Sequence, residues 1–357
     1  MLVALLLLTG CVSMPLSARE AAVGTIGKDV ILAAYDALVV DTAVLVTAAD
    51  AFCTAPDDAG LAAVRDAWWA ARTPWKQASV FKFGPYVDEP WRYGPLLDDW
   101  PTNDARLTEL LTSDEVLDST LPEDLGSTTR GFPAVEWLLW VEGEGTLLAF
   151  TDDASGRRCS LLELLAVDLD NNAKGIAAAW SPTGGDYLAT LALPDRDSGG
   201  FSDHAAVLTE LVNRGVFTVE DLRLERLGKP SGLTTGGDPH PEDVESPWSA
   251  RSLQDVKDGL DGVQHVWNGT RDGTPGSGLR SLLTTTQADL APAIDTAISE
   301  AAAALNAVPE PLAAAVTDDP DTINAAMDAL LALQVLLQAD LTSALGVTVL
   351  FNDNDGD

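Results

Sequence analysis

Apolar residues recur every three to four positions along most of the chain, which is the spacing of one face of an α-helix. Residues 28–52 are rich in Ala, Val and Leu and contain neither Gly nor Pro. Leu161, Leu165, Leu169 and Ile176 repeat with the same period in the stretch 160–180. Strict alternation of β-branched and polar residues is almost absent, so a substantial sheet is not expected. The pattern predicts an all-α protein.

The same spacing predicts the remaining helices. Trp68, Arg72 and Trp75 share one helix face if the helix that starts near residue 61 continues through Pro74. Pro133 fits the first position of a helix over 134–141, and Ser246 fits the N-cap of a helix that carries Leu253. Residues 84–103 form an aromatic, turn-rich loop. Other predicted helices cover 61–72, 104–118, 203–215, 218–227, 279–306 and 320–345.

A length of 357 residues exceeds what one compact core usually needs, so two domains are expected. Glycine pairs near 184–185 and 199–200 mark the break between them. We therefore expect one helical bundle over 28–195, a second over 200–350, and a solvated acidic tail over 351–357. No stretch after the amino terminus has the length and apolar character of a membrane-spanning helix.

The amino terminus has the character of an export signal. Residues 2–8 form an apolar run too short to span a bilayer, and Leu8-Thr9-Gly10-Cys11 resembles a bacterial lipobox. The segment lacks the Lys or Arg that usually precedes such a run. Two acyl chains on Cys11 anchor a protein stably where one chain would not. We expect residues 1–11 to be the signal and lipobox, residues 12–27 to be a tether, and the protein to be held at the periplasmic side of the envelope, with the outer membrane favoured.

The composition of the chain limits the classes of molecule that the protein is expected to bind. A hydrophobic fraction of 46% is too high for a disordered chain, and a formal net charge of −34 repels nucleic acid. Such a surface attracts cations and basic partners only loosely. Besides Cys11 the chain contains Cys53 and Cys159, which in an oxidising compartment either pair in a disulfide or remain free thiols. An interaction with another envelope protein is also compatible with this composition.

Four stretches, in this order, resemble segments of the imelysin-like family. Each is short, but their order and spacing extend over residues 28–345. The stretches are Trp69 to Trp75 followed by Phe81 to Pro85; Trp100-Pro101; Arg130-Gly131-Phe132-Pro133-Ala134-Val135-Glu136 with its apolar continuation to Trp140; and Leu227 to Gly232 continuing to Leu253.

The resemblance implies two packed four-helix-type bundles with a site at their interface, an exported location, and an association with iron acquisition. It also implies metallopeptidase activity, because the family's founding member was described as an insulin-cleaving metallopeptidase. In the family's G-x-H-x-x-E segment, His and Glu share a helix face and can meet on one metal ion. Here Pro133 replaces the histidine, and proline offers no lone pair to a metal.

Other peptidase signatures are also missing from the sequence. No H-E-x-x-H or G-x-S-x-G motif occurs, and the three histidines, His204, His240 and His265, are dispersed. We therefore expect a non-catalytic protein, with Glu136 as a weak metal candidate and iron or another divalent cation as a possible cofactor of unknown identity.

The candidate site residues are Arg72, Trp75, Gly131, Glu136, Glu245 and Ser249. In one interpretation they form a polar pocket between the bundles that binds a small ligand or ion. In the other, Arg72 and Glu136 form a buried ion pair that fixes how the bundles pack, since a buried charge needs a partner. The function we expect is a ligand-binding envelope lipoprotein linked to iron or metal uptake; a metallopeptidase and a structural or interaction module are the alternatives.

Overall fold

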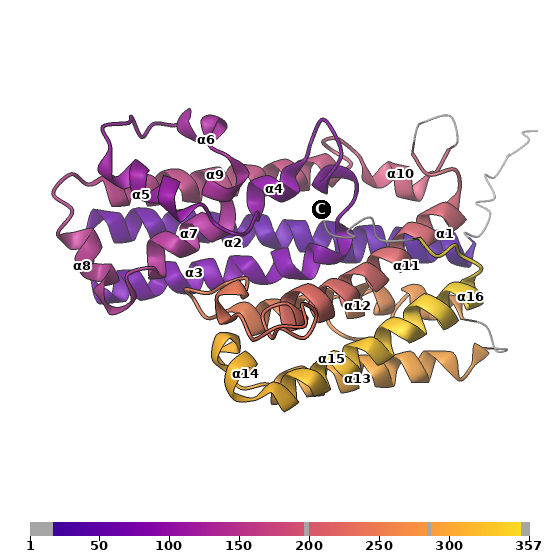
Figure 1. The fold of residues 1–357 in the computed structure, drawn as a ribbon. Helices are drawn as coiled ribbons and strands as arrows, with labels where there is room; N and C mark the ends of the chain where they lie inside the picture. Colours follow the sequence, from indigo (N-terminus) through magenta and orange to yellow (C-terminus); the bar gives the residue numbers. More distant parts are fainter. Residues whose placement is uncertain (1–16, 196–199, 284–286, 351–357) are drawn as a thin grey trace, which may run out of the picture.

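The computed structural model describes residues 17–195, 200–283 and 287–350. Within these ranges it contains helices and connecting loops but no strand, as the hydrophobic period predicts. Two groups of helices lie side by side (Figure 1). The signal and lipobox with Cys11, the first part of the tether, and the tail 351–357 lie outside the described residues.

The first group is built on three long helices: α2 (Ala33–Thr54), α3 (Asp58–Gln77) and α9 (Arg157–Trp180). Helix α2 packs along both α3 and α9, and α7 (Gly131–Trp140) packs against α9. Asp57 caps α3 by accepting a hydrogen bond from the amide of Gly60. The short helices α4 (Tyr93–Leu97), α5 (Asp104–Thr112) and α6 (Leu121–Asp124) pack on α9. In Figure 1, α8 (Thr146–Thr151) lies at one end of the group and α10 (Leu188–Ala192) at the other.

The second group contains α11 (His204–Asp221), α12 (Ser252–Asn268), α13 (Leu290–Ala307) and α15 (Pro320–Val335). Helix α12 is apolar on the face that carries Leu253, Val256, Leu260 and Val263, all of which are buried. The remaining pieces are α14 (Leu312–Asp318), α16 (Thr342–Leu345) and π-helical segments over Leu222–Gly228 and Leu336–Leu341. The apolar faces of these helices pack together, and their core is continuous with that of the first group.

The tether prediction is wrong from Ala18 onward, because helix α1 (Ala18–Thr25) continues through a π-helical segment (Ile26–Leu32) into α2. Ser17 and Glu20 form a capping box at its start, and Ala22 and Val23 are fully buried. Helix α1 packs against α11 of the second group. Burial of its apolar face explains why this segment is helical rather than an extended tether.

Two helices are long and apolar enough to cross a membrane, although the sequence pattern predicts no membrane-spanning helix. They are Ala18–Thr54 and Pro320–Leu345. In this structure, Leu38 and Leu45 of the first, and Leu330 and Leu333 of the second, are fully buried against other helices. Apolar side chains of the two helices therefore contribute to the core of the fold.

Several predicted boundaries are also wrong. The helix expected over 279–306 starts at Leu290, and residues Leu279–Leu282 form a 3₁₀ turn. The helix predicted over 104–118 ends at Thr112. Pro133 is the third residue of α7 rather than its first, but this position still lies in the first turn, where the missing amide costs no helical hydrogen bond. Ser246 does not cap α12, because the helix starts at Ser252 with Arg251 at its N-cap position; the Ser246 hydroxyl donates to Asp255.

A disulfide joins Cys53, near the end of α2, to Cys159, at the start of α9. Their Cα atoms are 5.4 Å apart, and 106 residues separate them in sequence. Of the two states that the sequence left open for these cysteines, the structure has the paired one. The bond fixes the ends of two helices that already pack along each other.

The two groups meet mainly where α3 packs against α12. Gly262 makes this approach close, since a Cβ atom at that position would clash with the carbonyl oxygen of Gln77. Pro74 lies inside α3 without ending it, so Trp68, Arg72 and Trp75 do share one face of a continuous helix. On that face Trp68 packs on Phe132 of α7, whereas Arg72 reaches Asp255 of the second group.

Candidate functional site

Arg72 is the central cation of the interface, with only 1% of its surface exposed. Its guanidinium donates to Asp98 Oδ1 at 3.1 Å and to Asp255 Oδ2 at 3.0 Å, and lies 3.5 Å from Glu245 Oε1. Burial disfavours its charge, but these carboxylates, led by Asp255, hold the pKa of Arg72 well above its ordinary value. The side chain is therefore permanently charged and joins three segments of the chain.

Lys76 lies one turn beyond Arg72 on α3 and contacts two of the same carboxylates. Its Nζ donates to Asp98 Oδ2 at 2.7 Å and forms a shorter ion pair with Glu245. Trp75 Nε1 also donates to Asp98 Oδ2, at 2.8 Å. Burial opposes the charge of Asp98, yet Arg72 and Lys76 outweigh this effect and hold the pKa of Asp98 far below its usual range.

Asp255 on α12 is the counterpart of Arg72 in the second group. It accepts from Ser246 Oγ at 2.5 Å and pairs with Arg251 one turn earlier on the same helix. Arg251 in turn donates to Asp258 at 2.7 Å. Burial again opposes ionisation, but Arg72 and Arg251 lower the pKa of Asp255. Every charge at this contact therefore has an oppositely charged partner, as buried ions require.

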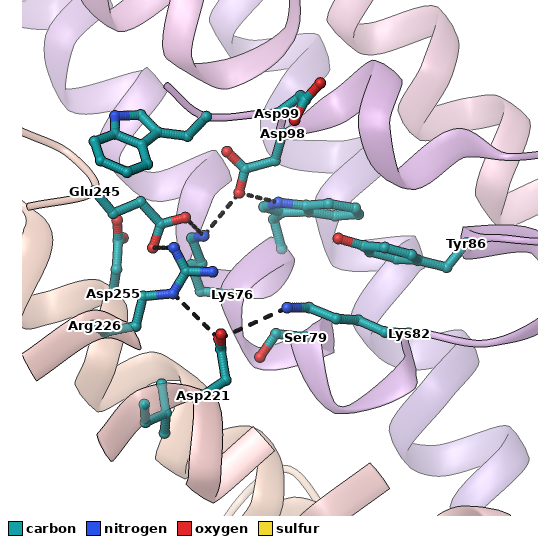
Figure 2. Close-up of a pocket in the computed structure, with 13 residues that line it drawn as sticks. Lys76, Ser79, Lys82, Tyr86, Asp98, Asp99, Asp221, Arg226, Glu245 and Asp255 are labelled. Atoms are coloured by element: carbon teal, nitrogen blue, oxygen red, sulfur yellow. Dashed lines mark hydrogen bonds and ion pairs between the residues drawn. The ribbon is translucent and has the colours of Figure 1, made fainter. Parts of the chain in front are cut away.

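A cavity of about 200 Å³ opens beside this network, between α3, the aromatic loop and the start of the π-helix that follows α11 (Figure 2). Arg226 on the π-helix lies 3.2 Å from Asp221 and 3.4 Å from Glu245. Burial disfavours the charge of Asp221, but Arg226 and Lys82 lower its pKa to about 2. The lining residues are Trp75, Lys76, Ser79, Lys82, Tyr86, Asp98, Asp99, Trp100, Asp221, Leu222, Arg226, Glu245 and Asp255.

Glu136 on α7 is 1% exposed and contacts the second group through Ser249. Both the amide and the hydroxyl of Ser249 donate to Glu136 Oε1, at 2.8 and 2.7 Å. Burial raises the pKa of Glu136 to about 7, and the neighbouring Arg72 only partly offsets it. This carboxyl group is thus held in place by the loop that precedes α12.

Gly131 and Trp75 have structural partners at the site. Gly131 has a φ of +72°, and a Cβ atom there would clash with the carbonyl oxygen of Leu97, so glycine is required. Trp75 stacks on Tyr86 with ring centroids 5.5 Å apart, and its indole lines the cavity. Gly131 therefore lets α7 start directly under the aromatic loop, and Trp75 forms one wall of the cavity.

The structure places Trp75 and Glu245 in the cavity wall, with Arg72 3.5 Å from Glu245, and pairs Glu136 with Ser249. The ion pair predicted between Arg72 and Glu136 is wrong: among the described residues Arg72 pairs with Asp98, Glu245 and Asp255. The three carboxylates reach Arg72 from three separate segments and occupy its donors. The Arg72 guanidinium also lies 5.5 Å from the centre of the Trp68 ring.

Sequence reasoning missed most of the cavity. Lys76 had a signal, because it follows Arg72 by four residues on the same helix face. Asp255 lies next to the apolar positions Leu253 and Val256 of α12, but the helix carries other charges, so the sequence does not single it out. No local pattern distinguishes Asp98, Asp221 and Arg226 from the many surface charges.

The residues present do not match a metal site of the kind that the motif resemblance implies. Pro133 offers no ligand beside Glu136, whose Oε1 already accepts two hydrogen bonds from Ser249. Within the described ranges, no group of three or more His, Cys, Asp or Glu side chains is arranged to hold a metal ion. The cavity carboxylates are paired with lysine and arginine instead. The side chains of the cavity are therefore arranged for hydrogen bonds and ion pairs.

The protein is therefore an all-helical protein of two packed bundles, with a charged cavity where the bundles meet. The chain belongs to the imelysin family, whose model matches residues 31–339. Iron-regulated protein A of Synechococcus elongatus is 28% identical over 286 residues, which cover 79% of this chain and 74% of that protein.

Two solved structures share the fold. A crystal structure assigned as an iron-regulated protein A precursor from Parabacteroides distasonis has a TM-score of 0.79 at 22% identity and covers 94% of this chain and 97% of its own. An imelysin-like protein from Psychrobacter arcticum has a TM-score of 0.76 at 19% identity and covers 95% and 100%. These likenesses establish the all-helical imelysin-like architecture.

Proposed function

We propose that this chain is a non-catalytic envelope lipoprotein that binds a small polar ligand in the cavity between its bundles. The observation that carries the proposal is the cavity itself: about 200 Å³ of space lined by charged groups and by the Trp75–Tyr86 stack. Ligand sites commonly lie between packed units and combine an apolar wall with a few fixed polar groups. The volume suits a molecule smaller than a typical drug.

The Arg72–Asp255 pair and its neighbours support this role by holding the cavity wall fixed. Arg72, Lys76 and Arg226 each contact two or more carboxylates from different segments. A wall fixed in this way loses little conformational freedom when a ligand binds, which favours affinity. The same network also satisfies the charges in the free protein, so an empty cavity is stable.

Binding can be tested by titration calorimetry on the full chain in mild detergent. The ligands are small anionic, neutral and cationic organic molecules, together with ferrous, ferric, zinc and calcium ions. We expect at least one organic molecule to bind with a Kd below 1 mM, and Ser79→Trp, which places an indole at the cavity wall, to abolish that binding. Ser299→Trp, on the exposed face of α13, is the matched control and should bind normally.

Absence of any binding tighter than millimolar would refute the ligand-binding proposal. Metal binding lost in Glu136→Gln, together with chelator-sensitive cleavage of casein, would replace it with the metallopeptidase alternative. An unchanged affinity in Ser79→Trp would place the bound molecule elsewhere on the protein.

A role in iron acquisition is the physiological part of the proposal. It rests on the family membership and on the relative named iron-regulated protein A. We expect the amount of this protein to rise when the cells are starved of iron, and deletion of its gene to slow growth in the presence of an iron chelator. Equal protein levels in iron-rich and iron-poor medium, with no growth defect, would contradict the iron link.

Envelope anchoring through Cys11 is proposed from the lipobox resemblance. Metabolic labelling with a radioactive fatty acid should label the wild-type protein but not Cys11→Ser. After cell fractionation the wild type should remain with the membranes and the variant should not. Unlabelled wild-type protein in the soluble fraction would rule out a lipid anchor.

A further inference from the structure

The cavity has two chemically different sides. On one side, the carboxylates of Asp98, Glu245 and Asp255 are each engaged by at least two cations or hydrogen-bond donors. On the other side lie Lys82, Ser79 and Tyr86, which follow one another along the chain after α3 and are labelled together in Figure 2. These three acceptors are therefore occupied, whereas the second side offers donors; the lining also contains Asp221, paired with Arg226, and Asp99, which accepts from Ser127.

Among the described residues Lys82 forms one ion pair, with Asp221, and the hydroxyls of Ser79 and Tyr86 have no hydrogen-bond partner. The nearest carboxylate oxygen to Lys82 Nζ belongs to Asp221, at 3.7 Å, which is too long for a hydrogen bond. Asp221 is itself held by Arg226 at 3.2 Å. The hydroxyls of Ser79 and Tyr86 make no hydrogen bond to another described residue, and in Figure 2 the Tyr86 hydroxyl and the Lys82 amine both point into the cavity. An ammonium and a phenolic hydroxyl thus face the same space, and Ser79 lies in its wall.

The fold fixes the positions of Lys82, Ser79 and Tyr86. Tyr86 is stacked on Trp75, so its ring cannot turn away from the cavity without losing that contact. Ser79 belongs to the 3₁₀ turn Ala78–Phe81 at the end of α3, and Lys82 is the residue that follows it. A group with several lone pairs placed among the three would accept hydrogen bonds that the protein leaves unmade. Carboxylate and phosphate oxygens are such acceptors, and hydrogen bonds to charged groups are the strong ones.

We propose that the cavity recognises the oxyanion group of a small carboxylate or phosphate, and that Lys82, Ser79 and Tyr86 bind this group. The inference deepens the proposed ligand-binding function and rests on it. The space of about 200 Å³ is smaller than the roughly 300–1,000 Å³ of pockets for drug-sized ligands, so it suits a molecule with few heavy atoms. Lys82 supplies the charge that compensates the anion, and the hydroxyls orient it.

The net charge of −34 opposes the approach of any anion over long distances. Screening removes most of this effect beyond about 8 Å at physiological ionic strength. Recognition therefore depends on the donors within the cavity rather than on attraction by the whole surface. Selection of one oxyanion over another follows from the shape of the space, which the experiment addresses by comparing ligands.

The test is titration calorimetry of the full chain at constant ionic strength. Succinate, citrate and inorganic phosphate are the oxyanions; succinamide is the neutral match for succinate, and putrescine is the cationic one. We expect at least one oxyanion to bind at least tenfold more tightly than succinamide and putrescine, since a charged hydrogen bond carries about this factor. The comparison of carboxylates with phosphate identifies which class the cavity prefers.

Variants then assign the residues. Lys82→Met should weaken oxyanion binding about tenfold or more, and Lys82→Arg should restore part of it. Ser79→Ala and Tyr86→Phe should each weaken it about two- to tenfold, as expected for loss of a neutral donor. Lys28→Met removes an exposed lysine outside the cavity lining and should bind like the wild type. Thermal melts confirm that each variant is folded.

The outcomes separate this inference from the function on which it rests. If no compound of any charge class binds, the ligand-binding function itself fails. If succinamide or putrescine binds and the oxyanions do not, the function holds and the oxyanion inference is wrong. Oxyanion binding that Lys82→Met changes by less than about twofold would also overturn the inference, because the group would then sit elsewhere.

Discussion

The Nε atom of Arg72 lies 3.0 Å from Asp255 Oδ2, and this contact joins α3 of the first bundle to α12 of the second. The same guanidinium also reaches Asp98 and Glu245. A single side chain therefore determines how a helix from the first half, a helix from the second half and two loops meet. Because the cavity lies beside this junction, the cavity forms only when the two bundles pack together.

Arg72→Met should destabilise the protein by about 3–5 kcal/mol, because it leaves buried carboxylates without their main partner. Denaturant unfolding followed by circular dichroism measures this difference. Arg92→Met is the matched control: Arg92 is exposed and, in the described part of the chain, pairs only with Glu89, so its loss should change stability by less than about 0.5 kcal/mol. Equal stability of Arg72→Met and wild type would show that the network does not hold the bundles together.

Glu136→Gln should remove one component of the pH dependence of stability. Burial raises the pKa of Glu136 from its ordinary value of 4.5 to about 7, so the folded state retains a proton there that the unfolded state releases. The stabilisation that the protonated Glu136 gives the folded state is therefore fully present below about pH 4.5 and is lost as the pH rises toward 7. Over this window the wild type should lose about 3 kcal/mol relative to the glutamine variant.

Unfolding of the two proteins at several pH values measures this difference directly. Glutamine retains an acceptor for Ser249, so the fold should persist. The comparison is needed because His265 acts in the opposite direction: burial lowers its pKa to about 4, and its contribution is lost as the pH falls below about 6.5. A constant difference between variant and wild type from pH 4.5 to 7 would contradict the raised pKa of Glu136.

Gly131→Ala should cost more than about 2 kcal/mol of stability, because φ is positive there and the added methyl group would clash with the carbonyl oxygen of Leu97. Gly126→Ala is the matched control in the same segment: its φ is −63° and a Cβ atom there meets no neighbour within 4 Å. Thermal unfolding of the two variants compares them. Similar melting temperatures would show that the aromatic loop moves away from α7 at little cost.

Stability should rise with salt concentration. The chain has 55 acidic and 21 basic residues, and among the described basic residues only Arg19, Lys28, Arg92 and Lys174 are exposed. The other described lysines and arginines are at least partly buried, which leaves a surface of mutually repelling carboxylates. Raising NaCl from 0.1 to 1 M shortens the screening length from about 10 to about 3 Å.

We expect Tm to rise by about 5 °C or more between these two salt concentrations. Sodium and potassium chloride should act alike if screening is the cause, and sucrose at equal osmolality should act less. A Tm that is flat or falls with salt would mean that surface repulsion is small, or that the ion pairs at the bundle interface are weakened as much as the surface is relieved.

The local sequence pattern was sufficient to predict the all-helical class and most of the long helices. It also predicted the face that Trp68, Arg72 and Trp75 share, because helix periodicity depends on residues that are close together in the sequence. It failed at Ala18–Thr25, where helix formation depends on packing against α11, and near Leu279–Leu282, where the Ala- and Leu-rich composition continues into a turn. Both errors concern segments whose conformation is decided by distant contacts.

The family motifs located Arg72, Glu136, Glu245 and Ser249, but sequence alone could not decide their partners. Arg72 had many carboxylates available, and only folding brought Asp98 and Asp255 within 3.1 Å of it. Burial then made these pairs obligatory, because an unpaired charge is costly away from water. Sequence thus determined which elements form. Tertiary structure decided which charges meet and left Lys82, Ser79 and Tyr86 facing a cavity, since such contacts join residues with no periodic relation along the chain.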